Sequence, residues 1–305
     1  MGLRRLTGSK SALAIHCGAW LSEGARHYDE SFSDSSKRDS GTRVHEALFT
    51  GSPANLESGD ERAMFMHGKS ALELILATHS NVQQECVYSI NLQTREGAAW
   101  PWLKDREYPK APSHVVFSTA DVVAAREGEL LVADFKTGEG EGVKEQLMTL
   151  ALSIVCSDQH RNAPPGKITL RAIYLKPEGF RTKDWDVTIA DLFEHKDVLS
   201  NAIDDQSYTP GPHCSQLYCP HAAYCPAHRG PREGLAGKED FEWDEVPTSS
   251  EHAGKMASAL KVIDRQSKYF KDCLKVWHRH GNRIIDGDWE LKDTDRGFRW
   301  VNNGK

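Results

Sequence analysis

The stretch LLVADFKTG, residues 130–138, combines a run of apolar side chains with one acid and one lysine. Apolar runs of this length that end at turn residues are typical of a strand that is buried on both faces. Asp134 and Lys136 are two residues apart, and successive side chains of a strand point to opposite faces. The stretch therefore predicts a buried strand that presents both polar groups on one face.

A second apolar run, at 114–125, comes directly before this strand and carries Asp121. Residues 126–128 (Arg-Glu-Gly) predict a hairpin turn between the two runs. Asp121 and Asp134 would then lie on adjacent strands, where two carboxylates can share a divalent cation such as Mg²⁺. Such a cation can lower the pKa of water and polarise a phosphoryl oxygen, and Lys136 would orient the nucleophile or neutralise developing charge.

A triplet of acid, any residue and lysine is not specific by itself. The chain has three of them, at Asp134/Lys136, Glu194/Lys196 and Glu290/Lys292. The alternative interpretation of the first triplet is an exposed ion pair at a strand end, which contributes little to stability. Only the first triplet lies in an apolar strand with an acid on the strand before it, so it is the candidate site.

The remaining hydrophobic patterns predict an α/β fold around one mixed sheet. The expected elements are helices at 9–23, 41–50 and 61–80, a strand at 86–92, the hairpin, a helix at 143–156, a strand at 168–175 and a helix at 188–204. Residues 100–112 carry three prolines and predict a loop. A core domain at 1–228, a linker at 229–250 and a helical tail at 251–305 complete the predicted organisation.

Three further residues are candidates for the site. His45, in GTRVHEAL, could bind a metal ion, although a helical histidine that faces a core is more commonly a satisfied polar residue. Glu85 begins the strand predicted at 86–92 and could add an acid, or could simply be solvated there. Gln146 lies one turn into the helix that follows Lys136 and could reach a phosphate or a base.

Three of the seven cysteines, Cys214, Cys219 and Cys225, fall within twelve residues. Gaps of four and five residues are wider than those of most zinc ribbons, and a tetrahedral or cubane site needs a fourth ligand. We choose Cys17, from the distant N-terminal helix. The neighbouring histidines keep a Cys/His zinc site open; they are His213, His221 and His228. Three unligated thiols are the less favoured alternative, because exposed reduced thiols are reactive.

The charge of the chain excludes a general attraction to nucleic acid. With a net charge of −6, DNA binding would need a local basic groove or metal ions that bridge to phosphate. The absence of an 18-residue apolar run and of an apolar stretch after MGLRRLTGSK predicts a cytoplasmic protein that does not bind membranes. The odd number of cysteines argues against a disulfide framework.

Together, these residues resemble the PD-(D/E)XK nuclease superfamily, in its RecB/AddB-like branch with an iron–sulfur cluster. CRISPR-associated adaptation nucleases and many phage exonucleases belong to that superfamily. The resemblance spans roughly residues 9–228 and runs in order through SALAIHCGAW, GTRVHEAL, TADVV, VADFKTG, EQLMTLAL and the cysteine triplet. Two features depart from the family pattern: Leu150 stands where the helix motif usually has tyrosine, and the first cysteine gap is unusually wide.

The resemblance implies a restriction-endonuclease-like mixed sheet that is flanked by helices and stapled by the cysteine cluster. It implies that His45, Asp121 and Asp134 bind Mg²⁺ or Mn²⁺. The implied catalytic residues are Asp121, Asp134, Lys136, Glu85 and Gln146, and the implied ligands of a [4Fe–4S] cluster are Cys17, Cys214, Cys219 and Cys225.

The implied function is that of a metal-dependent DNA exonuclease that hydrolyses phosphodiester bonds at ends or in single strands. Its setting would be phage or prophage recombination or DNA processing, in a bacterial or phage-infected cell and with a possible recombination partner protein. One alternative is an iron–sulfur-stabilised DNA-binding partner with an idle nuclease site, against which the intact acids and lysine count. Another is a zinc-bound interaction module, which would be colourless when purified.

Overall fold

The computed structural model describes residues 6–22, 36–103, 108–138 and 140–209, isolated residues between 213 and 250, and three strands after residue 283. The chain divides into two compact units. The first comprises Met1–His27 and Ser36–Arg229, and the second comprises Tyr28–Ser35 and Gly230–Lys305. All the candidate site residues belong to the first unit. None of its described helices is long and apolar enough to cross a membrane.

The first unit is built around one six-stranded mixed sheet, in the order β2-β1-β3-β4-β5-β6. Its strands are β1 (Asn81–Asn91), β2 (Gly97–Trp100), β3 (Val115–Arg126), β4 (Glu129–Lys136), β5 (Lys167–Lys176) and β6 (Gly179–Val187). Its α-helices are α1 (Ser11–His16), α2 (Ser36–Thr50), α3 (Gly59–Thr78), α4 (Val143–Val155) and α5 (Ile189–Asp204). Only β4 and β5 pair in parallel, through the crossover helix α4, and the other neighbours are antiparallel. The predicted α/β class and mixed sheet are confirmed.

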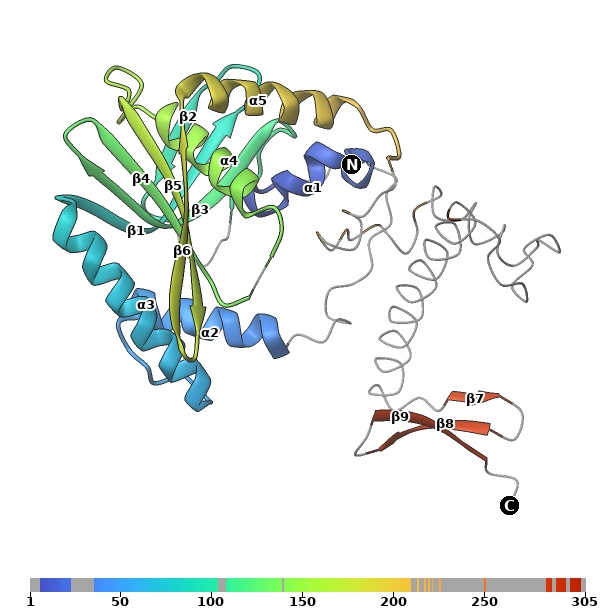
Figure 1. Cartoon of the computed structure of the whole chain (residues 1–305). Coiled ribbons are helices and arrows are strands. Elements are labelled where there is room, and N and C mark those ends of the chain that lie inside the picture. The colour runs from blue at the N-terminus through green and yellow to red at the C-terminus, as the bar shows by residue number, and fades with distance from the viewer. Residues whose placement is uncertain are drawn as a thin grey trace. The chain divides into compact units, whose positions relative to one another are not determined.

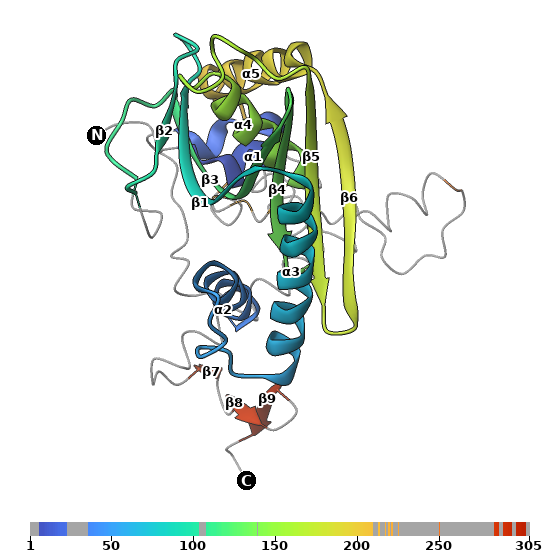
Figure 2. The same cartoon turned by 90° about the vertical axis from the view of Figure 1, so that its left-hand side faces the viewer.

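Helices cover both faces of the sheet (Figure 1, Figure 2). α4, α1 and α5 lie on one face, and α2 and α3 lie on the other. Side chains of β4 alternate between the two cores: Leu130 and Val132 pack on the α4 side, whereas Ala133 and Phe135 pack on the α2 side. Because both faces of β4 are covered, the strand is a nearly continuous apolar run, as the sequence indicates.

The predicted N-terminal helix at 9–23 is wrong as a single element. α1 ends at His16, Cys17 is extended with φ −161° and ψ 113°, and a short 3-10 turn follows at Ala19–Leu21. The interruption has a steric reason at Gly18. A Cβ added there would collide with the carbonyl oxygens of Ala202 and Asp205, so the backbone passes closer to the end of α5 than another residue would allow.

Two strands lie where the sequence analysis predicts none. β2 is short, and it ends at Trp100, the first residue of the predicted loop. β6 is an edge strand whose central residues, Arg181–Asp184, are exposed. Edge strands commonly carry charged side chains and little apolar alternation, so hydrophobic periodicity does not detect them.

The second unit contains an antiparallel three-stranded sheet of β7 (Ile284–Asp286), β8 (Trp289–Thr294) and β9 (Gly297–Asn302). The prediction of a helical tail at 251–305 is therefore wrong for this part. Trp289 and Leu291 alternate with polar residues, as do Phe298 and Trp300, and Asp-Gly and Asp-Arg-Gly sequences separate the runs, which is a strand and turn pattern. The predicted linker, apart from Ser250, and residues 251–283 of the predicted helical tail lie outside the described residues.

Candidate active site

The β3–β4 hairpin brings two buried acids together. Val122 pairs with Ala133 in the ladder, so Asp121 and Asp134 occupy the next position on the two strands. Their exposures are 5% and 3%. The backbone N–H of Phe135 donates a hydrogen bond to Asp121 Oδ2 at 2.7 Å, so the Asp121 carboxylate takes the place of a backbone partner at this end of the hairpin.

Asp134, Lys136 and Gln146 form a charged network between β4 and α4. Lys136 Nζ lies 2.7 Å from Asp134 Oδ2 and donates to Gln146 Oε1 at 3.0 Å. Gln146 Nε2 donates to Asp134 Oδ1, also at 3.0 Å. The contact of Lys136 with Asp134 Oδ2 is an ion pair without hydrogen-bond geometry, and no other described group donates to this buried oxygen. Asp134 Oδ2 therefore retains the capacity to bind a further partner.

His45 approaches the acids from the opposite face of the sheet. It lies on α2, whose residues Val44 and Ala47 are buried in the core between α2, α3 and the sheet. His45 Nδ1 is 3.4 Å from Asp121 Oδ2, and the ring meets Phe135 edge-on at 6.4 Å between centroids. The site thus combines side chains from helices on both faces of the sheet. His45 of α2 contacts Asp121 of β3 from one face, and Gln146 of α4 contacts Asp134 of β4 from the other.

Glu85 lies opposite Asp121, at a gap in the β1–β3 ladder. Gln84 pairs with Val122 and Cys86 pairs with Ala120, while Glu85 itself has φ +50°, in the left-handed region that non-glycine residues rarely adopt. A carboxylate oxygen of Glu85 lies within 4.8 Å of the ligand atoms of His45 and Asp121. Strained backbone of this kind costs of the order of 1–3 kcal/mol and is concentrated at functional sites.

Among the described residues, one set of three acids and histidines has all its ligand atoms within 4.8 Å of one another: His45, Glu85 and Asp121. The two carboxylates suit Mg²⁺ or Mn²⁺, whereas an imidazole is a more usual ligand of transition metals such as Zn²⁺ or Fe²⁺. The family resemblance predicts that Asp134 belongs to this ligand set and that Glu85 has a catalytic role. In the structure, Glu85 joins the compact set, while Asp134 lies beside it, engaged with Lys136 and Gln146.

The two carboxylates have opposite electrostatic environments. Burial raises the pKa of Asp134 above its usual range; the Lys136 ammonium opposes this shift and the Asp121 charge adds to it. Burial also acts to raise the pKa of Asp121, but the charge and hydrogen bond of His45, together with the hydrogen bond from the Phe135 N–H and the charge of Lys136, lower the pKa overall. Burial acts to lower the pKa of His45, yet Asp121 raises it overall. The contact between His45 and Asp121 therefore favours the ionised form of the Asp121 carboxylate, whereas burial disfavours the ionised form of Asp134.

An ion pair that sequence reasoning missed fixes α2 against α3. Arg43, two residues before His45, donates to the buried Glu61 carboxylate from Nε at 3.2 Å and from Nη2 at 2.5 Å. Glu61 also completes a capping box with Ser58 at the start of α3. The Ser58-x-x-Glu61 spacing is a recognised helix-start signal, and it could have placed the start of α3 at Gly59 rather than at Glu61.

The cysteine candidates lie partly outside the described residues, which include Cys17, Cys219 and Cys225 but not Cys214. These three are buried, and none of the described cysteines forms a disulfide. Cys17 Sγ lies 3.8 Å from the carbonyl oxygen of Ser207, just beyond α5. His16, which precedes Cys17, stacks on His213, which precedes Cys214 in the sequence, with ring centroids 5.1 Å apart. The N-terminal segment therefore contacts the segment that leads into the cysteine triplet.

Comparisons with known proteins add little to this geometry. No protein-family model matches the chain, and no curated protein matches it at a significant level. Solved structures include a match described as "Crystal structure of SSO0001", which is 16% identical and covers 55% of this chain and 69% of that chain, with a TM-score of 0.28. A likeness at this TM-score carries no argument about fold or function.

Proposed function

We propose that this protein is a metal-dependent deoxyribonuclease of the PD-(D/E)XK type, acting as an exonuclease on DNA ends or single strands. The observation that carries the proposal is the juxtaposition of two sets of side chains around the β3–β4 hairpin. The compact His45, Glu85 and Asp121 set lies beside the Asp134, Lys136 and Gln146 network. The first set suits a divalent cation, and the second holds a fixed ammonium, that of Lys136, which can approach a phosphodiester.

The donor set fits Mg²⁺ or Mn²⁺. His45, Glu85 and Asp121 would hold the cation, and the buried carboxylate of Asp134, whose Oδ2 is ion-paired with Lys136, is the natural additional ligand. When bound, such a cation supplies Lewis-acid polarisation of a phosphoryl oxygen and a lower pKa for water. The raised pKa of Asp134 is consistent with a carboxylate whose charge lacks full compensation within the protein.

Asp134, Lys136 and Gln146 hold a carboxylate and an ammonium in fixed positions. Lys136 keeps an ammonium at the end of β4, where it would neutralise negative charge developing on the phosphate during hydrolysis. Gln146 fixes the orientation of both Lys136 and Asp134 through its two hydrogen bonds. Because these groups are positioned before DNA arrives, little reorganisation is needed when the phosphodiester binds.

We further propose a [4Fe–4S] cluster on Cys17, Cys214, Cys219 and Cys225. The burial of the three described cysteines supports it, as do the contacts of Cys17 with Ser207 and of His16 with His213. Such a cluster would tie the N-terminal segment to a segment about 200 residues later, and the entropic cost of closing a long loop grows only logarithmically with its length.

The test of the proposed function is an anaerobic purification with measurement of iron and the visible spectrum. The same sample is then incubated with end-labelled single-stranded and duplex DNA and Mn²⁺ or Mg²⁺. We expect a brown protein with about four irons per cubane cluster that degrades DNA from its ends only with the cation. A brown protein that binds DNA without cutting it would instead favour the DNA-binding alternative, and a colourless zinc protein would contradict the cluster.

Site assignment is tested with matched pairs of variants. Asp134→Asn and Lys136→Ala should abolish cleavage and leave folding intact. The controls are Asp186→Asn and Lys167→Ala, which alter an exposed ion pair of 3.9 Å between β5 and β6. Cleavage by the Asp134 and Lys136 variants at the rate of the controls would overturn the assignment.

A further inference from the structure

The outermost strand β6 separates its charged side chains onto two faces. Figure 2 shows β6 at the edge of the sheet, beside β5. Side chains alternate along a strand, so Arg181 and Lys183 share a face with Val187, which packs in the core on the α4 side. Asp184 and Asp186 lie on the opposite face. The α4-side face of β6 is therefore basic.

The acids of β6 are paired with side chains of β5 on that opposite face. Arg171 Nε and Nη2 donate to the two carboxylate oxygens of Asp184, at 2.8 and 2.6 Å. Thr169 Oγ1 donates to Asp186 at 2.7 Å, and Lys167 Nζ lies 3.9 Å from the same carboxylate. β5 has no acidic residue of its own. The α4-side face of these two strands, both of which the structure describes in full, thus has no carboxylate.

Each cation on the α4-side face of β6 lies over an aromatic ring. The guanidinium carbon of Arg181 is 4.9 Å from the centroid of the Tyr174 ring, and Lys183 Nζ is 5.0 Å from that of Trp185. A cation within about 6 Å of a ring centroid is attracted by the quadrupole of the ring. Arg181 and Lys183 are nevertheless exposed. The rings therefore hold both charges against the sheet in positions that a phosphate can reach.

The strand register connects these cations to the candidate active site. Lys136 pairs with Tyr174 across β4 and β5, and Tyr174 pairs with Arg181 across β5 and β6. Neighbouring strands are about 4.8 Å apart, so the Cα atom of Arg181 is about 10 Å from that of Lys136. Lys183 lies in the next row across the sheet, level with Asp134. The basic face of β6 is therefore continuous with the site around Lys136.

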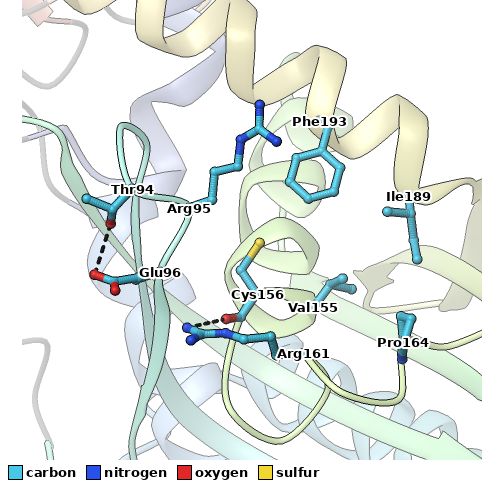
Figure 3. Close-up of a pocket in the computed structure, with 9 residues that line it drawn as sticks. All are labelled: Thr94, Arg95, Glu96, Val155, Cys156, Arg161, Pro164, Ile189 and Phe193. Carbon is cyan, nitrogen blue, oxygen red and sulfur yellow. Dashed lines mark hydrogen bonds between the residues drawn. The ribbon is translucent and has the colours of Figure 1, made fainter.

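A cavity elsewhere in the same unit contains two other arginines and provides a control. Arg95 and Arg161 line this cavity, of about 400 Å³, between the β1–β2 connection and the end of α4. Figure 3 shows their guanidinium groups at opposite ends of the cavity, pointing apart. Arg95 covers the ring of Phe193, 5.2 Å from its centroid, much as Arg181 covers Tyr174. Arg95 is thus an exposed arginine with the same kind of ring contact but without the connection to the site.

We propose that Arg181 and Lys183 bind phosphates of the DNA strand that lie next to the scissile phosphate. The inference rests on the proposed nuclease function, which places the scissile phosphate near Lys136. Because the chain has a net charge of −6, it has no general attraction to DNA, and a local group of cations is what backbone binding requires. Phosphate contacts position a strand without reading its sequence, which suits an exonuclease.

The test is the affinity of the full chain for labelled single-stranded and duplex DNA, measured by fluorescence anisotropy in EDTA at several salt concentrations. Arg181→Gln and Lys183→Gln should each weaken single-strand binding roughly fivefold at about 0.1 M salt. Each should also reduce the slope of log Kd against log salt by about 0.7 for single strands, or about 0.9 for duplex, because one phosphate contact is lost. The slope change with each form therefore identifies which one occupies β6.

Two sets of variants separate charge from structure. Arg181→Lys and Lys183→Arg keep the charge and should keep the salt slope. Arg95→Gln, and Lys167→Gln on the opposite face of β5, should bind as the parent does. Cleavage with Mn²⁺ gives a second readout, in which the Gln variants of Arg181 and Lys183 should raise KM and leave kcat nearly unchanged, because they act on binding rather than on the reacting phosphate.

The outcomes distinguish this inference from the proposed function. If the parent cuts DNA and the Gln variants of Arg181 and Lys183 match the controls in affinity, salt slope and KM, the inference is overturned and the nuclease proposal stands. The two cations would then serve only to cover Tyr174 and Trp185 and to keep the edge strand from pairing with another chain. A parent that neither binds nor cuts DNA would overturn both.

Discussion

Gln146 spans the two charged groups of β4: its Nε2 donates to Asp134 Oδ1 and its Oε1 accepts from Lys136 Nζ, each at 3.0 Å. An amide has one donor end and one acceptor end, so a single side chain can orient a carboxylate and an ammonium together. Alanine removes both hydrogen bonds, and glutamate keeps only the acceptor function. Gln146 is therefore a positioning residue as well as a group that could contact DNA.

Replacement of Gln146 by alanine should lower the cleavage rate roughly 10–100-fold, which is the effect of losing one or two hydrogen bonds to charged groups. The initial rate of label release from end-labelled DNA at saturating Mn²⁺ measures it. Gln146→Glu should be impaired as well, because it adds a carboxylate beside Asp134. Gln159→Ala, at an exposed position, is the matched control. Equal rates for Gln146→Ala and Gln159→Ala would refute the positioning role.

Glu85→Gln should weaken Mn²⁺ binding by roughly tenfold or more, because the compact ligand set loses one of its two anionic oxygens. Calorimetric titration of the chain with Mn²⁺, without DNA, provides the measurement. Glu178→Gln, at an exposed turn before β6, is the control and should bind as the parent does. An unchanged affinity in Glu85→Gln would remove Glu85 from the ligand set.

Glu61 should contribute stability that depends on pH. Its pKa is lowered to about 2, first by the hydrogen bond from Arg43, against an ordinary value of 4.5. A carboxyl group whose pKa is lower in the folded state stabilises the fold at pH values above the unfolded-state pKa. This stabilisation is lost as the pH falls through the folded-state pKa. The difference in unfolding free energy between the parent and Glu61→Gln should therefore be full above pH 4.5 and shrink toward pH 2. Denaturant unfolding at several pH values measures it, and a pH-independent difference would argue against the ion pair.

Gly18→Ala should destabilise the fold by about 1–3 kcal/mol, the usual cost of overpacking, because the new methyl group meets backbone carbonyls of Ala202 and Asp205. If the neighbouring Cys17 is a cluster ligand, iron content should fall together with stability. Gly59→Ala is the control, since a Cβ added there meets nothing within 4 Å. Thermal unfolding and iron analysis test both effects, and normal values in Gly18→Ala would exclude close docking of this segment.

Local sequence patterns predicted the central elements of the fold, the β3–β4 hairpin and helix α4, correctly. Residues 114–135 form the predicted hairpin because apolar runs on both strands are buried on both faces, and the turn lies at Glu127 and Gly128, which both have positive φ. α4 begins at Val143, as predicted, and its inner face includes Leu147 and Leu150. Leu150 is fully buried in that core, so the position that differs from the family motif serves packing in this chain.

The same patterns did not reveal features that depend on distant neighbours. Glu85 looks like any strand residue in the sequence, and its left-handed conformation coincides with the gap in the β1–β3 ladder opposite Asp121. The break at Cys17 follows from the approach of Gly18 to α5, almost 190 residues away, which no local periodicity encodes.

The sequence by itself determined the α/β order of elements, the acids on neighbouring strands and the lysine two residues after Asp134. These are consequences of hydrophobic period and of spacing within one strand or hairpin. Tertiary structure alone decided that His45 and Gln146 reach those acids from opposite faces of the sheet, and that Glu85 joins His45 and Asp121. The reason is physical: which side chains meet depends on helix packing and strand order, and these are set by the burial of both cores together.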